Sequence, residues 1–176
     1  AINILMEKGD VDRAREYLTR LTGNYPLTKQ VIYTENHLLN CIVAYAVKEA
    51  EKRNISLNHI IDMPEGIRLS DSDLYSLFIN IIENAIEACS AVENTEKRSM
   101  ELFCNMKNGF IHVLCKNSKQ NDVVVEEGKY VSTKASGARR GFGIGIVEKI
   151  VEKYHGVMDI EYGTKWFQIR LVLKAE

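Results

Sequence analysis

The stretch 74–89, which reads LYSLFINIIENAIEAC, decides the fold of this chain. Placed on a helix at about 100° per residue, its polar side chains fall within roughly a third of the circumference. With the residue that precedes the stretch, this polar set comprises Asp73, Ser76, Asn80, Glu83, Asn84 and Glu87. An ordinary surface helix has a broad polar face and a narrower buried one. The pattern therefore predicts a buried helix. Its polar edge either faces a ligand or is the one solvent-exposed edge of a core helix.

Length and composition define the class of protein. The chain has 176 residues, is 45% hydrophobic and 27% charged, and carries a formal net charge of -1. These values fit one folded domain with an appendage and argue against disorder and against a nucleic-acid surface. No apolar run approaches the roughly 18 residues that span a bilayer, and no signal peptide is visible. Four cysteines without metal-ligand spacing are expected to be reduced core thiols: Cys41, Cys89, Cys104 and Cys115.

The start of the chain predicts a helical hairpin over residues 1–22. One helix ends at Gly9, Asp10 caps the next, and Gly23 ends it. Such a hairpin is too small to fold alone and needs either preceding chain or a second copy. We therefore expect residues 1–32 to form a helical appendage with its linker and residues 33–176 to form the folded domain. Because Ala1 lies in mid-pattern, we expect the chain to be a fragment.

Periodicity predicts alternating helices and strands along the remaining chain. Helices are expected over 35–53, from 70 or 71 through the central stretch, and from about 143 to 154; strands are expected over 55–61, 100–106, 110–116, 157–162 and 166–173. The turn at Lys107-Asn108-Gly109 joins two of these strands in a hairpin. Residues 117–140 are polar without a clear period, which is typical of a lid or a disordered segment. The order predicts an α/β fold, a two-layer sandwich with a mixed sheet and helices on one face.

A glycine turn precedes the last predicted helix. Gly141 and Gly143 would let backbone N–H groups approach a phosphate at the positive end of that helix. The turn is neither a P-loop nor a dinucleotide fingerprint. Upstream, Ser132-Thr133-Lys134 supplies hydroxyls and an ammonium suited to close over phosphates. An Asn on the buried helix can offer a neutral oxygen to a Mg²⁺ ion that also binds phosphate and water. These features together favour a site for a magnesium nucleotide.

At this point the motifs resemble a known family. Asn80-Ile81-Ile82-Glu83-Asn84-Ala85 is similar to the N-box of the Bergerat-type ATP-binding fold, which sensor histidine kinases share with DNA gyrase, heat-shock chaperones and mismatch-repair proteins. Ser132-Thr133-Lys134 with Gly141-Phe142-Gly143-Ile144 resembles the lid and last glycine box of that fold. The resemblance covers about residues 33–176. Within the family, NIIENAIEAC and IVEKYHG look most like the peptide-responsive quorum-sensing kinases.

The resemblance implies that the chain binds ATP and Mg²⁺. Asn84 would ligate the metal, and Asn80 would support the phosphates one turn earlier. The implied cofactor-binding set is Asn80, Asn84, Asn117, Thr133, Lys134, Arg140, Gly141, Phe142 and Gly143. The implied catalytic set is Asn80, Glu83 and Lys134, where Glu83 either polarises a nucleophile or is a solvated or Lys-paired carboxylate.

Two features depart from the family pattern. The D-x-G-x-G box, whose Asp binds the adenine amino group, is replaced by Asn117-Ser118, which can still accept a hydrogen bond but lacks the glycines. Glu87 stands where many kinases carry a basic residue. Arg139 and Arg140 either replace that phosphate contact or are solvated on the polar lid.

The resemblance implies the catalytic, ATP-binding part of a sensor histidine kinase in a two-component pathway. Its partners would be a response regulator, an upstream phosphoacceptor helix and a second protomer, in a cytoplasmic portion of a protein anchored to the membrane upstream. None of the four histidines precedes a Glu or Asp, so the acceptor is expected upstream of Ala1; these are His37, His59, His112 and His155. Two alternatives are an ATP-hydrolysing relative, which Asn80 disfavours because a carboxylate is needed there, and a degenerate nucleotide-binding module.

Overall fold

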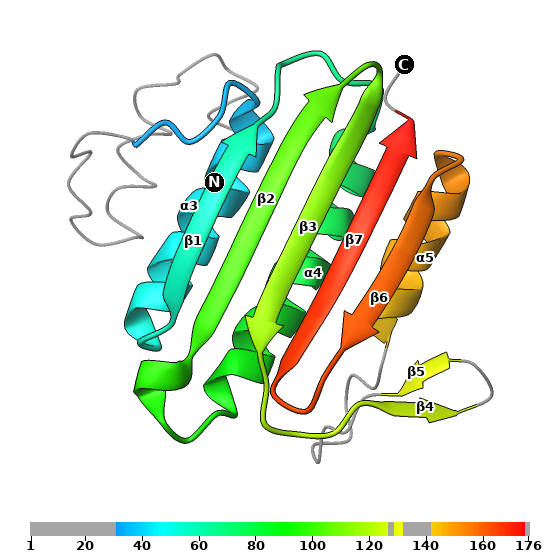
Figure 1. Cartoon of the computed structure of the whole chain (residues 1–176). Coiled ribbons are helices and arrows are strands. Elements are labelled where there is room, and N and C mark those ends of the chain that lie inside the picture. Colours follow the sequence, from blue (N-terminus) through cyan, green and yellow to red (C-terminus); the bar gives the residue numbers. More distant parts are fainter. Residues whose placement is uncertain (1–30, 127–128, 132–141, 175–176) are drawn as a thin grey trace, which may run out of the picture. The chain divides into compact units, whose positions relative to one another are not determined.

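The computed structural model describes residues 31–126, 129–131 and 142–174. The chain divides into a unit of residues 1–31 and a unit of residues 32–176, and the second contains every described element (Figure 1). In chain order these are α3 His37–Lys52, β1 Ser56–Asp62, α4 Asp71–Ser90, a 3-10 turn Thr95–Lys97, β2 Ser99–Lys107, β3 Phe110–Ser118, β4 Val124–Glu126, β5 Lys129–Val131, α5 Phe142–Lys153, β6 Val157–Tyr162 and β7 Trp166–Lys174.

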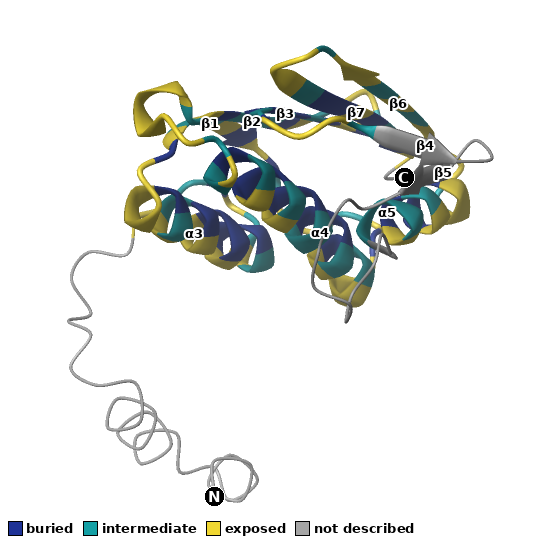
Figure 2. Ribbon diagram, turned by 90° about the horizontal axis from the view of Figure 1, so that it is seen from below, coloured by how far each residue is buried: buried dark blue, intermediate teal, exposed yellow. Residues whose placement is uncertain are grey.

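The strands form a mixed sheet. Five of them are ordered β1-β2-β3-β7-β6, and β4 and β5 make a separate two-stranded ribbon. β1 runs parallel to β2, whereas the other neighbours in the large sheet are antiparallel. The helices α3, α4 and α5 lie side by side on one face of this sheet (Figure 2). This arrangement confirms the predicted two-layer α/β fold with a mixed sheet and helices on one face.

The central helix α4 is the most deeply packed of the three. Ser70 caps it, since the Ser70 Oγ accepts a hydrogen bond from the Asp73 N–H at 3.2 Å. Its buried side chains are Leu74, Leu77, Phe78, Ile81, Ile82, Ala85, Ile86 and Cys89. α4 lies between α3 and α5 beneath the sheet (Figure 2). Within the stretch 74–89 its exposed residues are Tyr75, Glu83 and Glu87. The predicted burial of the stretch 74–89 is confirmed.

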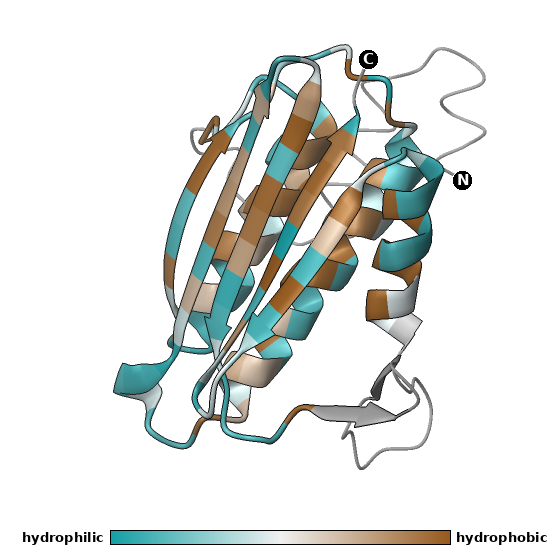
Figure 3. Ribbon diagram, turned by 45° about the vertical axis from the view of Figure 1, so that its right-hand side comes forward, coloured by the Kyte–Doolittle hydropathy of each residue, from teal (hydrophilic) through white to brown (hydrophobic). Residues whose placement is uncertain are grey.

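The hairpin between β2 and β3 has the turn that the sequence predicts. Asn108 and Gly109 both adopt positive φ, 52° and 77°, as a two-residue type I′ turn requires. Along both strands buried residues alternate with more exposed ones, and Figure 3 shows bands of hydrophobic and hydrophilic residues across the sheet. Residues such as Leu102 and Val113 are buried beneath the helices, and their neighbours Phe103 and Leu114 lie on the open face of the sheet.

Some expectations need correction. The segment 117–140 is not a continuous loop, since its first two residues extend β3 and part of it forms the β4–β5 ribbon. Cys41 is exposed and is therefore not a core thiol. The hairpin predicted over residues 1–22 and its linker lie outside the described residues.

Candidate functional site

Two side-chain amides lie one turn apart on α4. Asn80 and Asn84 are both partly buried. The Asn80 Nδ2 donates to the Ser76 carbonyl at 2.6 Å. The part of the chain that the structure describes gives the Asn84 amide no hydrogen-bond partner. Because partly buried amides normally find partners, the Asn84 side chain is suited to receive a ligand.

The first turn of α5 lies directly against these amides. A methyl group at Gly143 would lie 3.0 Å from the Asn84 Nδ2 and 3.2 Å from the Asn80 Oδ1. This backbone can come so close because glycine has no Cβ. The first N–H groups of a helix have no partner within it and carry a partial positive charge. The structure thus brings Asn80 and Asn84 of α4 against Gly143 in the first turn of α5, with amide oxygens and backbone N–H groups at one place.

The donor set at this place is compatible with Mg²⁺ but not with a metal held by protein ligands alone. No group of three or more His, Cys, Asp or Glu side chains that could hold a metal occurs among the described residues. Mg²⁺ commonly binds few protein ligands and keeps its waters and substrate phosphates. One Asn84 oxygen would suffice for that mode. Burial raises the pKa of Cys104 and of Cys115 and keeps these two residues as thiols.

Glu83 is directed to the other side of α4. Its side chain is exposed and interacts with Tyr45 of α3. Partial burial raises the pKa of the Tyr45 hydroxyl, and the negative charge of Glu83 raises it further. In the described part of the chain Glu83 is thus an exposed carboxylate beside the Tyr45 hydroxyl, and its part in polarising a nucleophile stays a prediction.

Asn117 lies near the end of β3 on the face that the helices cover. It is 4% exposed, and its Nδ2 donates to the Ser118 carbonyl at 2.9 Å. In the sheet it stands between Met100 of β2 and Phe167 of β7. Asn117 is therefore an interior residue whose amide already makes one local bond.

Other predicted site residues lie in the segment between β5 and α5. Thr133, Lys134, Arg140 and Gly141 lie outside the described residues, as does Arg139. For Phe142 the structure describes the backbone, which begins α5. Of the nine predicted cofactor-binding residues, the structure brings together Asn80, Asn84 and Gly143.

Two residues, Asp73 and Lys119, have structural roles that the sequence does not predict. Asp73 was grouped with the polar edge of α4, but it bonds to Lys153 and Tyr154 at the far end of α5. Lys119, which is 8% exposed, donates to the carbonyls of Asn121 and Thr164 and so ties the chain after β3 to the β6–β7 turn. The contacts of Asp73 with α5 and of Lys119 with Thr164 span long sequence separations, and no local pattern could have indicated them.

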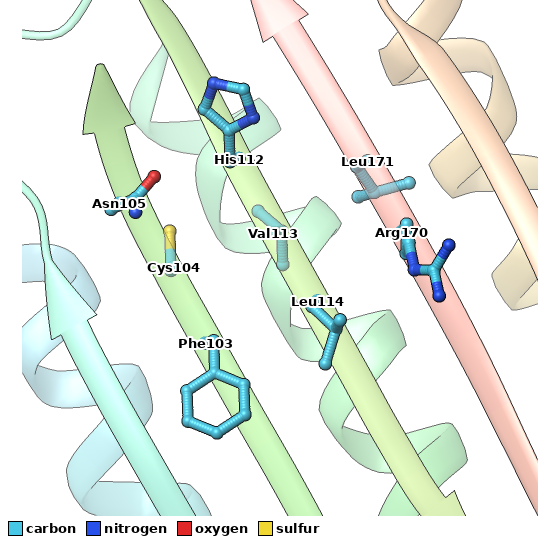
Figure 4. A pocket seen from close by; sticks show the side chains of 8 residues that line it. All are labelled: Phe103, Cys104, Asn105, His112, Val113, Leu114, Arg170 and Leu171. Atoms are coloured by element: carbon cyan, nitrogen blue, oxygen red, sulfur yellow. The ribbon is translucent and has the colours of Figure 1, made fainter.

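A shallow hollow of about 230 Å³ lies on the opposite, open face of the sheet (Figure 4). Its lining comprises Phe103, Cys104, Asn105, His112, Val113, Leu114, Arg170 and Leu171. The side chains come from β2, β3 and β7, and α4 lies behind these strands in the view. The hollow contains none of the predicted site residues, so it is separate from the amide site.

Comparison with known proteins agrees with this arrangement. The family model described as the GHKL domain matches residues 69–174, which is more than half of the chain. The sensor histidine kinase NatK of Bacillus subtilis is 26% identical over 176 residues, 97% of this chain and 54% of NatK. A probable C4-dicarboxylate sensor kinase of Halalkalibacterium halodurans is 28% identical over 108 residues, 59% of this chain and 20% of that protein. The chain thus spans about half or less of these two relatives.

Solved structures share the fold. The catalytic domain of histidine kinase ThkA superposes with a TM-score of 0.60 at 21% identity, covering 78% of this chain and 90% of that one. The mycobacterial sensor histidine kinase MprB gives 0.56 at 15% identity, covering 77% and 94%. The described part of the chain contains no helix with the length and hydrophobicity needed to cross a membrane. With its matching family model, its fold and its paired amides beside a glycine turn, this chain belongs to the GHKL domain family.

Proposed function

We propose that this chain is the ATP-binding catalytic part of a sensor histidine kinase. The observation that carries the proposal is the close approach of Gly143 to the amides of Asn80 and Asn84. It puts a neutral metal ligand and the positive end of α5 at one place, as a magnesium nucleotide needs. Bound Mg²⁺ would neutralise phosphate charge, and catalysis of phosphoryl transfer consists largely of such neutralisation and of positioning.

The described residues take distinct roles in this proposal. Asn84 offers an oxygen to the metal, and Asn80, fixed by its bond to the Ser76 carbonyl, supports the phosphates. The first N–H groups of α5, at Phe142 and Gly143, donate hydrogen bonds to phosphate oxygens. The lid residues Thr133, Lys134 and Arg140, with Gly141, would complete the phosphate contacts.

The phosphoacceptor histidine is proposed to come from another helix of the full-length kinase. His112 lies on the open face of the sheet, and His155 follows the far end of α5. His37 pairs with Glu65 at 2.9 Å, and His59 packs edge-on against Tyr33. A phosphoryl group moves to a nucleophile only within about 3–3.5 Å of it. None of the four is held beside Asn84 by these contacts.

The finer assignments extend the same proposal. The segments NIIENAIEAC and IVEKYHG support a place among the peptide-responsive quorum-sensing kinases, with a response regulator as the next acceptor. A nucleotide-dependent binding module is the second candidate function, because Asn117 replaces the adenine-binding Asp and its Nδ2 is bonded to the Ser118 carbonyl. ATP hydrolysis is disfavoured, since the residue one turn before Asn84 is an amide, Asn80.

Asn84→Asp tests the proposal. The substitution keeps the size of the side chain but places a negative charge where phosphate charge would bind, so the Kd for Mg²⁺-ATP is expected to rise about tenfold or more. Calorimetric titration of the folded chain measures it. Asn58→Asp, at an exposed position of β1, makes the same charge change away from the site and should leave the Kd unchanged. Equal affinities for the wild type and Asn84→Asp would show that Asn84 is not in the site.

A further inference from the structure

The far end of α5 is joined to the start of α4 by a polar cluster. The Asp73 Oδ2 accepts hydrogen bonds from the Lys153 Nζ at 2.6 Å, the Tyr154 hydroxyl at 2.6 Å and the Ser70 Oγ at 2.7 Å. The Tyr154 oxygen in turn accepts from the Ser70 N–H at 3.1 Å. We call Ser70, Asp73, Lys153 and Tyr154 the clasp. It connects residues about 80 positions apart in the chain.

The clasp is a charged hydrogen-bond network, more than a surface ion pair. Lys153 is 60% exposed, so its ion pair with Asp73 alone is weak. The Asp73 side chain is only 17% exposed and receives the Tyr154 and Ser70 hydroxyls as well. The bonds from Lys153, Ser70 and Tyr154 lower the pKa of the Asp73 carboxyl to about 2. Asp73 is therefore ionised at neutral pH, and its bonds are the stronger, charge-assisted kind.

The clasp and the amide site mark the two ends of one antiparallel helix pair. From Asp73 to Asn84, α4 rises about 16 Å, and from Gly143 to Lys153, α5 rises about 15 Å, at 1.5 Å per residue. The two contacts therefore fix the same relative register of the helices. A slide of α5 along its axis would therefore do two things together. It would break the clasp, and it would move the first turn of α5 away from the amides of Asn80 and Asn84.

The apolar packing between the helices does not set this register strictly. α5 buries Val147, Ile150 and Val151, and burial of apolar groups has no directional preference. Hydrogen bonds at 2.6 Å do have one, because they weaken steeply with misalignment. Within the described part of the chain, the clasp holds the directional bonds that join the side chains of α4 and the end of α5.

We propose that Asp73 and Tyr154 are positioning residues for nucleotide binding, since the clasp holds the first turn of α5 where its N–H groups face phosphates at Asn80 and Asn84. This inference rests on the proposed function, in which ATP binds at that place. Asp73 and Tyr154 touch no nucleotide in it and act through the position of α5.

Tyr154→Phe and Asp73→Asn test the inference in the full 176-residue chain. Each keeps the shape of the side chain and removes bonds of the clasp, so the Kd for Mg²⁺-ATP is expected to rise about threefold to tenfold. Hydrogen exchange of residues 142–147 should be faster in both variants when ATP is present. Ile111→Val is the control, because it lowers stability in the buried part of β3, at a position that belongs to neither α4 nor α5.

The outcomes separate the inference from the proposed function. A weaker affinity in both clasp variants, with wild-type affinity in Ile111→Val, supports the positioning role. Wild-type affinity in the folded clasp variants overturns it, and so does an equal loss in Ile111→Val, which would mean a general effect of stability. If the wild type itself does not bind ATP, the proposed function is overturned, and the inference with it.

Discussion

The two ends of α5 differ in how their polar groups are used. At the amino-terminal end, Gly143 lies against two amides, and the Asn84 amide has no hydrogen-bond partner among the described residues. At the carboxyl-terminal end, one Asp73 oxygen alone accepts three hydrogen bonds. The carboxyl-terminal end of α5 thus lies in a hydrogen-bonded network, whereas its amino-terminal end lies beside the Asn84 amide, which makes no hydrogen bond within the described residues.

The carboxyl-terminal end is also closed through its backbone. The Gly156 N–H donates to the Val151 carbonyl at 2.8 Å, and the His155 N–H donates to the Glu152 carbonyl at 3.0 Å, the two bonds of a Schellman motif. A methyl group at Gly156 would lie 2.4 Å from the Val172 oxygen, so this glycine lets β7 approach the helix end. The difference teaches that polar groups are satisfied where the architecture must be held, and left available where we propose that a ligand binds.

The largest expected effect comes from breaking the amino-terminal end with Gly143→Ala. The new methyl group would press on both the Asn84 and Asn80 amides, at 3.0 and 3.2 Å, and would push α5 away from them. We expect the Kd for Mg²⁺-ATP to rise about tenfold, which corresponds to about 1.4 kcal/mol. Calorimetry on the purified chain measures it.

Gly145→Ala is the matched control for this experiment. It lies on the same helix two residues later, and a methyl group there meets no atom within 4 Å. Because alanine favours helices over glycine, Gly145→Ala should keep the affinity and slightly raise the free energy of unfolding. If the two alanine variants bind ATP equally well, the close approach at Gly143 has no part in binding.

A smaller effect is expected from Asp73→Asn, on stability at the carboxyl-terminal end. The pKa of Asp73 is lowered from 3.8 to about 2 in the folded state, so its charge stabilises the fold above about pH 3.8. This contribution disappears as the pH falls towards 2, because the Asp73 carboxyl becomes protonated. The Asn side chain does not titrate, so it has no such pH dependence. We expect Asp73→Asn to lose about 1 kcal/mol at neutral pH, a modest value because solvent screens Lys153, and the gap to the wild type to close at acid pH.

Urea unfolding at about pH 7 and about pH 3 measures this gap. The Tyr154→Phe variant is a useful companion, since it removes one donor and leaves the Asp73 carboxyl titrating. A difference between the wild type and Asp73→Asn that stays constant over this range would contradict a charged Asp73 in the clasp.

Much of the fold could be predicted from the sequence, because its signals are local. The period of residues 74–89 predicted the buried helix, and Asn108-Gly109 predicted the hairpin turn that its positive φ values confirm. The side of α4 that meets the glycine turn also followed from period, since Asn80 and Asn84 are one turn apart. That these residues bind ATP stays a prediction.

What could not be predicted depends on contacts between distant parts of the chain. The polar edge of α4 was one stripe in the sequence, but tertiary packing divides it among three neighbours. Asn84 lies by Gly143, Glu83 by Tyr45 and Asp73 by Lys153. The helical period specifies the direction of each side chain around the helix axis, but it does not specify which other element of the fold that side chain contacts.

The smallest expected effect, His155→Gly, sharpens the comparison by changing the carboxyl-terminal end through the backbone alone. His155 adopts a φ of 50°, a left-handed conformation that costs a side chain with a Cβ about 1 kcal/mol and that glycine adopts freely. Glycine also makes the unfolded chain more flexible, which offsets part of this gain. We therefore expect a net increase of about 0.5 kcal/mol in the free energy of unfolding, measured with urea. Asn54→Gly, at the same position after α3 with a φ of 53°, should gain less, since asparagine tolerates this conformation. The affinity for ATP should not change, because the clasp is intact. A loss of stability in His155→Gly would show that the imidazole itself, and not only the turn of the backbone, helps to hold this end of α5.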